Sequence, residues 1–189
     1  MAALYFVLGG ARSGKSAYAE GLADSLADSL AESLAESLAD PAGGGNLFYL
    51  ATAQIFDEEM AARIKLHQQR RGPQWQLIEA PIDLGPALAK ADSPANVILI
   101  DCLSVWITNI LIHEYDVDAA RTTLMDQLAR CEGTIIVVAS ETGLGIIPDN
   151  ALSRRFRDAN GHLNQAIARQ ADEVFFMTAG IATKVKPQK

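Results

Sequence analysis

The chain contains few cysteines, no long hydrophobic run and no basic N-terminal segment. Cys102 and Cys131 are its only two cysteines, and their spacing suggests neither a disulfide framework nor a zinc site. We expect both thiols to be reduced and buried. No apolar run approaches the roughly 20 residues of a membrane span, and the start lacks the basic region of a signal peptide. These features predict a cytoplasmic protein without a membrane span.

Basic residues are outnumbered, which gives a net charge of −7 and a pI near 4.9. That balance argues against a nucleic-acid-binding surface and favours a small-molecule ligand. Residues 22–40 repeat the unit Leu-Ala-(Asp/Glu)-Ser without any Lys or Arg. Leucines four residues apart drift by about 40° per step around a helix, so only part of the repeat can face a core. We expect it to extend a helix, with either a solvated end or a contact to a subunit or partner.

Apolar strand-like runs alternate with helix-like segments along the whole chain. The expected strands are Leu4–Leu8, Leu47–Leu50, Val97–Ile100, Thr134–Ala139 and Val174–Thr178, with a weaker one at Gln76–Glu79. The expected helices are Lys15–Ala39, Glu58–Arg70, Leu84–Lys90, Leu103–His113, Ala119–Cys131 and Asn150–Ala171. This βα rhythm predicts an α/β fold: a single domain over residues 1–189 with a mostly parallel central sheet and helices on both faces.

A phosphate-binding loop follows the first predicted strand. Residues 9–16 fit the pattern G-x-x-x-x-G-K-[ST] and comprise Gly9, Gly10, Ala11, Arg12, Ser13, Gly14, Lys15 and Ser16. In such a loop, backbone N–H groups and the N-terminus of the next helix bind phosphate oxygens. Lys15 is expected to bridge the β- and γ-phosphates, and the Ser16 hydroxyl to ligate Mg²⁺.

Two carboxylates follow predicted central strands. Asp101 ends the run Val97–Ile100, and Glu141 lies just after Thr134–Ala139. The carboxyl edge of a parallel sheet is where ligands bind, so Asp101 is expected to hold Mg²⁺ or contact the nucleotide rather than only cap a helix. Glu141 either faces the substrate or the terminal phosphate, or is solvated in a glycine-rich turn.

His67 is the candidate nucleophile. On its predicted helix it shares a face with Arg63 and Arg70 at i, i+4, i+7 spacing. Guanidinium charge favours neutral, nucleophilic imidazole and also binds phosphate, although a lone helical histidine is more often structural.

Other polar and aromatic residues give less specific indications of function. Trp75 and Trp106 are expected to be packing residues, and His113 and His162 to be structural or exposed. Arg154, Arg155 and Arg157 either bind an anionic group or are solvated.

Taken together, the motifs resemble the bifunctional adenosylcobinamide kinase/adenosylcobinamide-phosphate guanylyltransferase family of cobalamin biosynthesis. The resemblance spans nearly the whole chain. Besides residues 9–16, the matching segments are 49–54 (Tyr-Leu-Ala-Thr-Ala-Gln), 57–64 with His67, Arg70-Arg71, Trp75, Glu79, 101–103, 141–148, 156–158, Gly161, Asn164-Gln165 and 171–174.

The resemblance implies two reactions and a set of residues. The hydroxyl of adenosylcobinamide attacks the γ-phosphate of ATP or GTP; GTP then guanylylates a histidine, which passes GMP to the phosphorylated corrinoid. The family's guanylylated histidine falls on His67. Its nucleotide contacts fall on Gly9 to Ser16, Ala51, Thr52, Ala53, Gln68, Gln69, Arg70, Arg71, Glu79 and Asp101. Nucleotide and corrinoid are then the small-molecule partners, one edge strand is antiparallel, and the protein is a homotrimer.

Two departures from the family pattern concern the details. The repeat inserts extra helical turns after the phosphate-binding loop, and Ala53 and Asp101 stand where Ser and Glu are common in the family. Two other functions remain open from the residues alone. One is a P-loop small-molecule kinase without guanylyl transfer, and the other is a nucleotide-dependent binding or assembly protein.

Overall fold

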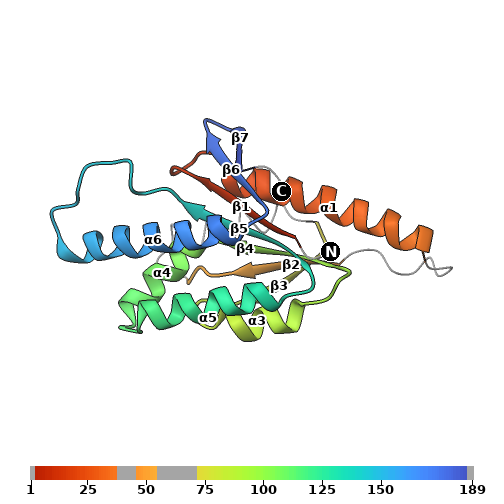
Figure 1. Ribbon diagram of the computed structural model, residues 1–189, viewed down its shortest axis with the longest axis horizontal. Coiled ribbons are helices and arrows are strands. Elements are labelled where there is room, and N and C mark those ends of the chain that lie inside the picture. The colour runs from red at the N-terminus through yellow and green to blue at the C-terminus, as the bar shows by residue number, and fades with distance from the viewer. Residues whose placement is uncertain (1–2, 38–45, 55–71, 187–189) are drawn as a thin grey trace.

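A seven-stranded sheet organises the part of the chain that the computed structural model describes, residues 3–37, 46–54 and 72–186 (Figure 1). The strands lie in the order β3-β2-β4-β5-β1-β6-β7. Strands β1 to β6 are parallel to their neighbours, and β7 pairs antiparallel with β6. The strands are β1 Leu4–Gly9, β2 Asn46–Ala51, β3 Trp75–Glu79, β4 Asn96–Asp101, β5 Thr134–Ser140, β6 Glu173–Thr178 and β7 Ile181–Lys186.

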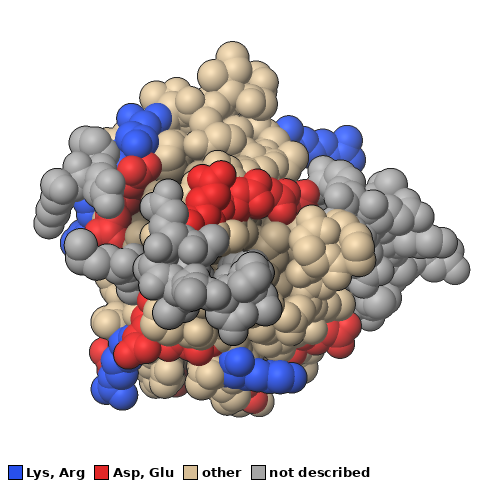
Figure 2. Space-filling model, turned by 90° about the vertical axis from the view of Figure 1, so that its right-hand side faces the viewer, with Lys and Arg blue, Asp and Glu red and all other residues tan. Residues whose placement is uncertain are grey.

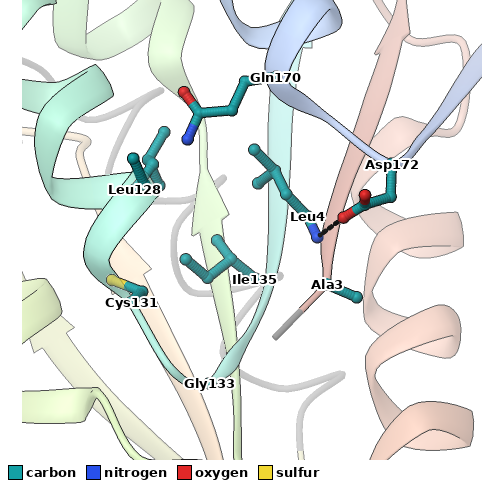
Figure 3. A pocket seen from close by; sticks show the side chains of 9 residues that line it. Ala3, Leu4, Leu128, Cys131, Gly133, Ile135, Gln170 and Asp172 are labelled. Carbon is teal, nitrogen blue, oxygen red and sulfur yellow. Dashed lines mark hydrogen bonds between the residues drawn. The ribbon is translucent and has the colours of Figure 1, made fainter. Parts of the chain in front are cut away.

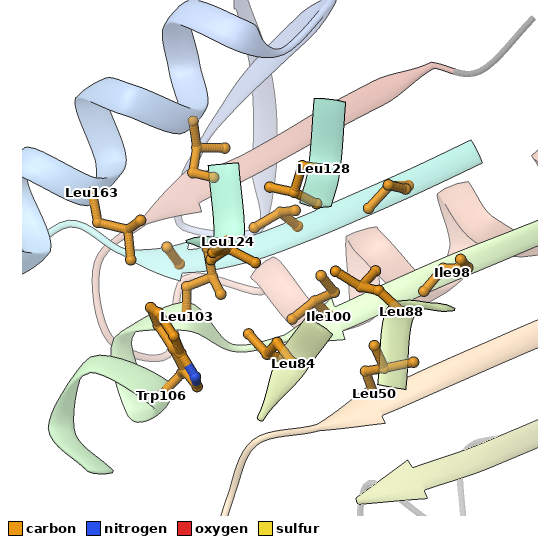
Figure 4. Packing of buried hydrophobic residues seen from close by; sticks show 14 of the residues in the cluster. Leu50, Leu84, Leu88, Ile98, Ile100, Leu103, Trp106, Leu124, Leu128 and Leu163 are labelled. Atoms are coloured by element: carbon orange, nitrogen blue, oxygen red, sulfur yellow. The ribbon is translucent and has the colours of Figure 1, made fainter. Parts of the chain in front are cut away.

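Helices cover both faces of the sheet, as the sequence predicts. They are α1 Lys15–Ser37, α3 Leu84–Ala91, α4 Leu103–Ile112, α5 Val117–Arg130 and α6 Ala151–Gln170. Along β4, Val97 and Leu99 pack on the α1 side, whereas Ile98 and Ile100 belong to the core on the opposite face. Figure 4 shows this second core, where side chains of α3 to α6 meet the sheet. A strand buried on both faces has no polar alternation, which is why β4 reads as a continuous apolar run.

The fold class and the mostly parallel sheet are confirmed, and residue patterns missed one strand. β7 follows β6 through Ala179 and Gly180, whose φ angles are +50° and +83°. Positive φ at both central residues is the geometry of a type I′ hairpin turn, which favours antiparallel pairing. The antiparallel edge strand was expected from the family resemblance alone. The predicted helix Glu58–Arg70 lies outside the described residues.

Small residues bring α1 close to the sheet. Ala19, Ala23 and Ala27 are buried, whereas the leucines Leu22 and Leu26 are only half-buried beside them. The buried stripe of α1 is therefore made by alanines at i, i+4, i+8, the residues that precede the acidic positions. Alanine at a contact lets two elements approach more closely than leucine allows.

The first unit of the acidic repeat belongs to the folded domain. The Asp24 carboxylate accepts hydrogen bonds from Gln74 and Trp75, and its burial raises its pKa. Figure 2 views the molecule from the end of α1 and shows Asp and Glu side chains gathered on that face, with Lys and Arg at its periphery. Within the described ranges, no helix is long and apolar enough to cross a membrane.

Candidate functional site

The loop between β1 and α1 is fixed by two glycines. A Cβ atom on Gly9 would lie 2.6 Å from the Met177 carbonyl oxygen, so no other residue fits there without displacing β6. Gly14 has a φ of +92°, a conformation that side chains disfavour. Arg12 also adopts positive φ, at 55°. The Gly180 N–H donates to the Ser13 carbonyl at 3.0 Å, which ties the loop to the β6–β7 turn.

Lys15 is folded back over this loop. Its side chain is largely buried, and Nζ donates to the Gly10 carbonyl oxygen at 2.5 Å. Burial lowers the pKa of the Lys15 ammonium, and the nearby Asp101 carboxylate acts in the opposite direction. Within the described residues, the buried Ser13 hydroxyl oxygen has no hydrogen-bond partner. A buried hydroxyl in a loop of this shape is a donor for a phosphate oxygen.

Parallel pairing aligns the other candidate residues along the same edge of the sheet. Ala51, at the end of β2, is paired with Glu79 on one side and Asp101 on the other. On β1, Gly9 is paired with Ser140, the last residue of β5. The structure thus brings Glu79, Ala51, Asp101 and the phosphate-binding loop to the carboxyl edge of the sheet. For Asp101 and the loop, this placement is the one that the sequence predicts.

Asp101 is oriented by a residue that sequence reasoning missed. The Tyr49 hydroxyl donates to Asp101 Oδ2 at 3.0 Å, and the Tyr49 ring meets Trp75 edge-on with 6.2 Å between centroids. Tyr49 is part of the β2 run and looks like any core aromatic in sequence. Only the pairing of β2 with β4 reveals it as a partner of Asp101. Trp75 packs here, as expected, and the buried Trp106 donates through Nε1 to the Ile82 carbonyl at 2.6 Å.

Thr52 joins the ends of β2 and β4. Its hydroxyl donates to the Cys102 carbonyl at 2.8 Å and accepts from the Cys102 N–H at 2.9 Å. The residue is fully buried, so its side chain holds the edge together. Its role as a nucleotide contact, like that of the half-buried Ala53 beside it, stays a prediction.

Glu141 begins a loop that is anchored to the phosphate-binding loop. Its N–H donates to the Gly9 carbonyl at 2.9 Å. The preceding residue is held by a buried network: Ser140 N–H donates to the Ser104 hydroxyl at 2.7 Å, and Asn160 Nδ2 donates to the Ser140 carbonyl at 2.8 Å. Residues of α4 and α6 therefore determine where Glu141 starts. Sequence reasoning did not single out Ser104 or Asn160, because nothing local marks them as partners.

Several of the predicted site residues lie in a segment that the structure does not describe. His67, Gln68, Gln69, Arg70 and Arg71 lie outside the described residues, as does Arg63. Arg154 has a structural role, since Nη1 donates to the carbonyls of Pro148 and Asp149 at 3.0 and 2.6 Å. Both cysteines are free thiols, and both residues are half-buried rather than buried as expected.

The donors expected for a metal ion are a hydroxyl and a carboxylate. Ser16 begins α1 beside Lys15, and Asp101 ends β4 with its carboxylate oriented by Tyr49. Mg²⁺ is usually held by one or two carboxylates or hydroxyls together with substrate phosphates and water, and this pair fits that pattern. The described ranges contain no group of three His, Cys, Asp or Glu side chains arranged to hold a metal. Such a group would be the mark of a site that binds metal without substrate.

A small cavity lies at the opposite edge of the sheet. It measures about 150 Å³ and is lined by residues including Leu4, Cys131, Ile135, Gln170 and Asp172 (Figure 3). There the Asp172 carboxylate accepts from the Leu4 N–H at 2.9 Å, which ties the start of β1 to the turn before β6. The cavity is near the amino ends of β1 and β5 and takes no part in the candidate site.

Comparison with known proteins assigns the chain to a family. The family model described as cobinamide kinase / cobinamide phosphate guanyltransferase matches residues 5–185. The chain belongs to this family. A member of the cobinamide kinase / cobinamide phosphate guanyltransferase family is a transferase, and the predictions of an enzyme and of this family are confirmed.

Two curated relatives cover almost the whole chain. The bifunctional adenosylcobalamin biosynthesis protein CobP of Pseudomonas aeruginosa is 40% identical over 182 residues, 95% of each chain. The bifunctional adenosylcobalamin biosynthesis protein CobU of Salmonella typhimurium is 33% identical over 198 residues, 97% of this chain and 99% of the relative. A solved structure from Pyrococcus horikoshii OT3 covers 99% of this chain and 87% of its own, with a TM-score of 0.56 at 7% identity. That likeness concerns the fold alone.

Proposed function

We propose that this chain phosphorylates adenosylcobinamide with ATP or GTP and then transfers GMP from GTP to the product through a guanylylated histidine, His67. Family membership over residues 5–185 supports both activities. One observation carries the proposal: a complete phosphate-binding loop, Asp101 and Glu79 all lie at one edge of the sheet. An edge of this kind serves nucleotide phosphates.

In the kinase step, the acceptor hydroxyl oxygen bonds to the γ-phosphorus as the bond to the β–γ bridging oxygen breaks. The nucleoside diphosphate leaves and the hydroxyl proton is lost to solvent or a base. Lys15 is poised to bind the β- and γ-phosphates, because its ammonium lies over the loop and donates to the carbonyl of Gly10 there. The N–H groups of residues 10–16 and the N-terminus of α1, whose first turn contains no acidic residue, stabilise phosphate charge.

Magnesium fits this site as the companion of the nucleotide. Ser16 and Asp101 are the residues that would hold it, and a bound Mg²⁺ neutralises charge that develops on the phosphate oxygens. The chain's own contribution is orientation. Tyr49 fixes one oxygen of Asp101, and Thr52 fixes the backbone that follows it.

In the second reaction, an imidazole nitrogen of His67 bonds to the α-phosphorus of GTP and pyrophosphate leaves. A phosphate oxygen of the phosphorylated corrinoid then attacks the same phosphorus, the P–N bond breaks and neutral imidazole is regenerated. A phosphoramidate transfers its phosphoryl group readily, so two in-line displacements replace one difficult exchange.

Labelling with GTP that carries radioactive α-phosphate tests this proposal. Wild-type protein should retain acid-labile GMP, and His67→Ala should lose the label while its cobinamide kinase activity remains measurable. His162→Ala is the matched control, because His162 is exposed on α6. An unchanged label in His67→Ala would refute the assignment. Absence of label in wild type, with the kinase intact, would instead favour a plain P-loop kinase.

The remaining expectations concern assembly and location. We propose a single-domain subunit that forms a homotrimer and works in the cytoplasm on nucleotide and corrinoid substrates. A nucleotide-dependent assembly protein would bind GTP but form neither phosphorylated corrinoid nor adenosylcobinamide-GDP. Product analysis by mass spectrometry distinguishes that alternative.

A further inference from the structure

The loop between β5 and α6 has an apolar tip that is open to solvent. Leu144, Ile146 and Ile147 are 82%, 96% and 67% exposed. Single exposed apolar residues are common, but three large ones within four positions mark a contact surface. The segment from Thr142 to Pro148 contains no charged residue. The surface therefore suits a neutral, apolar occupant.

Both ends of this loop are fixed, although its tip is not covered. At the first end, Glu141 N–H donates to the Gly9 carbonyl at 2.9 Å, and Gly143 N–H donates to Glu141 Oε1 at 2.5 Å. At the other end, Arg154 holds the carbonyls of Pro148 and Asp149. Between these anchors the apolar side chains point away from the domain. A tip held in this way is preorganised for binding, because little loop entropy is lost on contact.

The position of the loop relates it to the phosphate-binding loop. β5 is the parallel neighbour of β1, so the loop leaves the sheet directly beside Gly9 and extends beyond the carboxyl edge before α6 begins (Figure 1). Ile146 is five residues after Glu141, hence within about 18 Å of it even in a fully extended chain. The tip and the phosphate-binding loop thus lie beyond the same edge of the sheet.

We infer that Leu144, Ile146 and Ile147 form the seat for the ring of the corrinoid acceptor, an inference that rests on the proposed function. A corrin ring is broad, with methyl groups on its faces and amides around its rim. Its faces match the three apolar side chains. The exposed glycines Gly143 and Gly145 leave peptide groups accessible to the amides. The site thus combines a nucleotide end at residues 9–16 with an acceptor end at residues 144–147.

The double variant Leu144→Ser/Ile146→Ser tests this assignment. We expect the dissociation constant and the KM for cobinamide to rise about tenfold, because apolar contact area is lost. Affinity for a non-hydrolysable GTP analogue should not change. Ile146→Leu keeps the apolar area and should retain affinity. Val185→Ser is the matched control, since Val185 is 59% exposed at the far end of β7. Equilibrium dialysis with cobinamide and the GTP analogue provides both constants, and light scattering gives the mass.

Each result bears on the inference. Selective loss of cobinamide affinity at unchanged mass supports it. Unchanged cobinamide affinity in the double variant overturns it while leaving the proposed function intact, provided that wild type still phosphorylates cobinamide. A double variant that falls apart into smaller species also overturns it, because a second copy of the chain then covers the tip. Wild-type protein that neither binds nor phosphorylates cobinamide overturns both the inference and the proposed function.

Discussion

The Tyr49 hydroxyl is the contact that gives Asp101 a defined direction. A carboxylate at a strand end can rotate freely unless a donor holds one oxygen, and here the donor comes from the neighbouring strand. A hydrogen bond to a charged group contributes about 1.5–3 kcal/mol, more than one between neutral groups. Tyr49 is therefore a positioning residue for the proposed magnesium ligand.

Tyr49→Phe should lower the kinase kcat about tenfold and raise the Mg²⁺ concentration needed for half-maximal rate, because Asp101 then samples other orientations. Steady-state kinetics over a Mg²⁺ series measures both quantities. Tyr115→Phe is the control, as Tyr115 is 54% exposed on the surface. A variant with a lower melting temperature but an unchanged Mg²⁺ requirement would show that Tyr49 is only structural.

Lys15→Ala should reduce the kinase rate by about 100-fold or more, since the substitution removes the positive charge that is positioned to stabilise the transferred phosphoryl group. The side chain is largely buried, so the fold should be compared by circular dichroism. Initial rates of phosphocobinamide formation give the result. Normal phosphorylation by this variant would contradict the role of the loop.

Both thiols should react slowly with Ellman's reagent at pH 8. Burial raises the pKa of Cys102 to about 12 and that of Cys131 to about 11. Thiolate is the reacting form, so reaction should be on the order of 100-fold slower than for a free thiol, and denaturant should release two thiols at the normal rate. For an acid whose pKa is raised on folding, the free energy of unfolding is unaffected below about pH 8.5 and falls above it. Fast native labelling would contradict these burials.

At the scale of elements, β7 does more than extend the sheet. Lys186 Nζ donates to the carbonyls of Ala168 and Arg169 at 3.0 and 2.9 Å, and also to Ala171. These carbonyls lie at the C-terminal end of α6, where backbone C=O groups have no N–H donor within the helix. A cation at a helix C-terminus is also favoured by the helix dipole. The edge strand thereby caps the helix that positions Glu141.

Lys186→Met should lower the free energy of unfolding by about 1–2 kcal/mol, because carbonyls at the end of α6 lose their donor. Urea denaturation followed by circular dichroism measures this change. Lys184→Met is the matched control, because the ion pair of Lys184 with Glu173 is partly solvated and contributes less than about 1 kcal/mol. Equal effects of the two substitutions would mean that the cap has no special role.

Ala23→Leu should destabilise the domain by about 1–3 kcal/mol, since α1 packs on the sheet through alanines and has no space for a larger side chain. Ala17→Leu is the control, the same substitution at an exposed position of the same helix. Thermal denaturation of both variants provides the comparison. A neutral Ala23→Leu would show that α1 can move away from the sheet without cost.

The elements differ in how far their sequences predict them. Continuous apolar runs predicted β1, β2, β4, β5 and β6, because strands buried on both faces need nothing else. The alternating polar residues of β7 gave no such signal. The leucine repeat drew attention to leucines, yet the alanines are the buried residues and the leucines beside them are only partly buried. Which side chains of α1 become buried depends on how closely the helix approaches the sheet, and that distance is a property of the tertiary structure.

For the whole molecule, the order of the strands explains which site residues were predictable. Lys15 and Ser16 come from a local motif, and a carboxylate after a buried strand is a local signal too. Tyr49, Ser104 and Asn160 act through partners that are distant in the sequence, at separations of 52, 36 and 20 positions for the bonds that define them. No local pattern encodes such pairs, so only the register of β2, β4 and β5 reveals them.

The oligomeric state is the prediction that belongs to this scale. Size-exclusion chromatography with light scattering should give about three times the subunit mass of 20.3 kDa. The measurement should be repeated with GTP, because binding at a subunit boundary would stabilise the assembly. A monomer under both conditions would contradict the homotrimer.

The place of β1 in the sheet has a consequence for the newly made chain. β1 is synthesised first, yet its two neighbours are β5 and β6, which begin at residues 134 and 173. While the ribosome produces the intervening residues, the N-terminal strand has neither partner and its apolar side chains stay unprotected. The phosphate-binding loop, although it lies within the first 16 residues, is therefore among the last parts of the protein to reach its final surroundings.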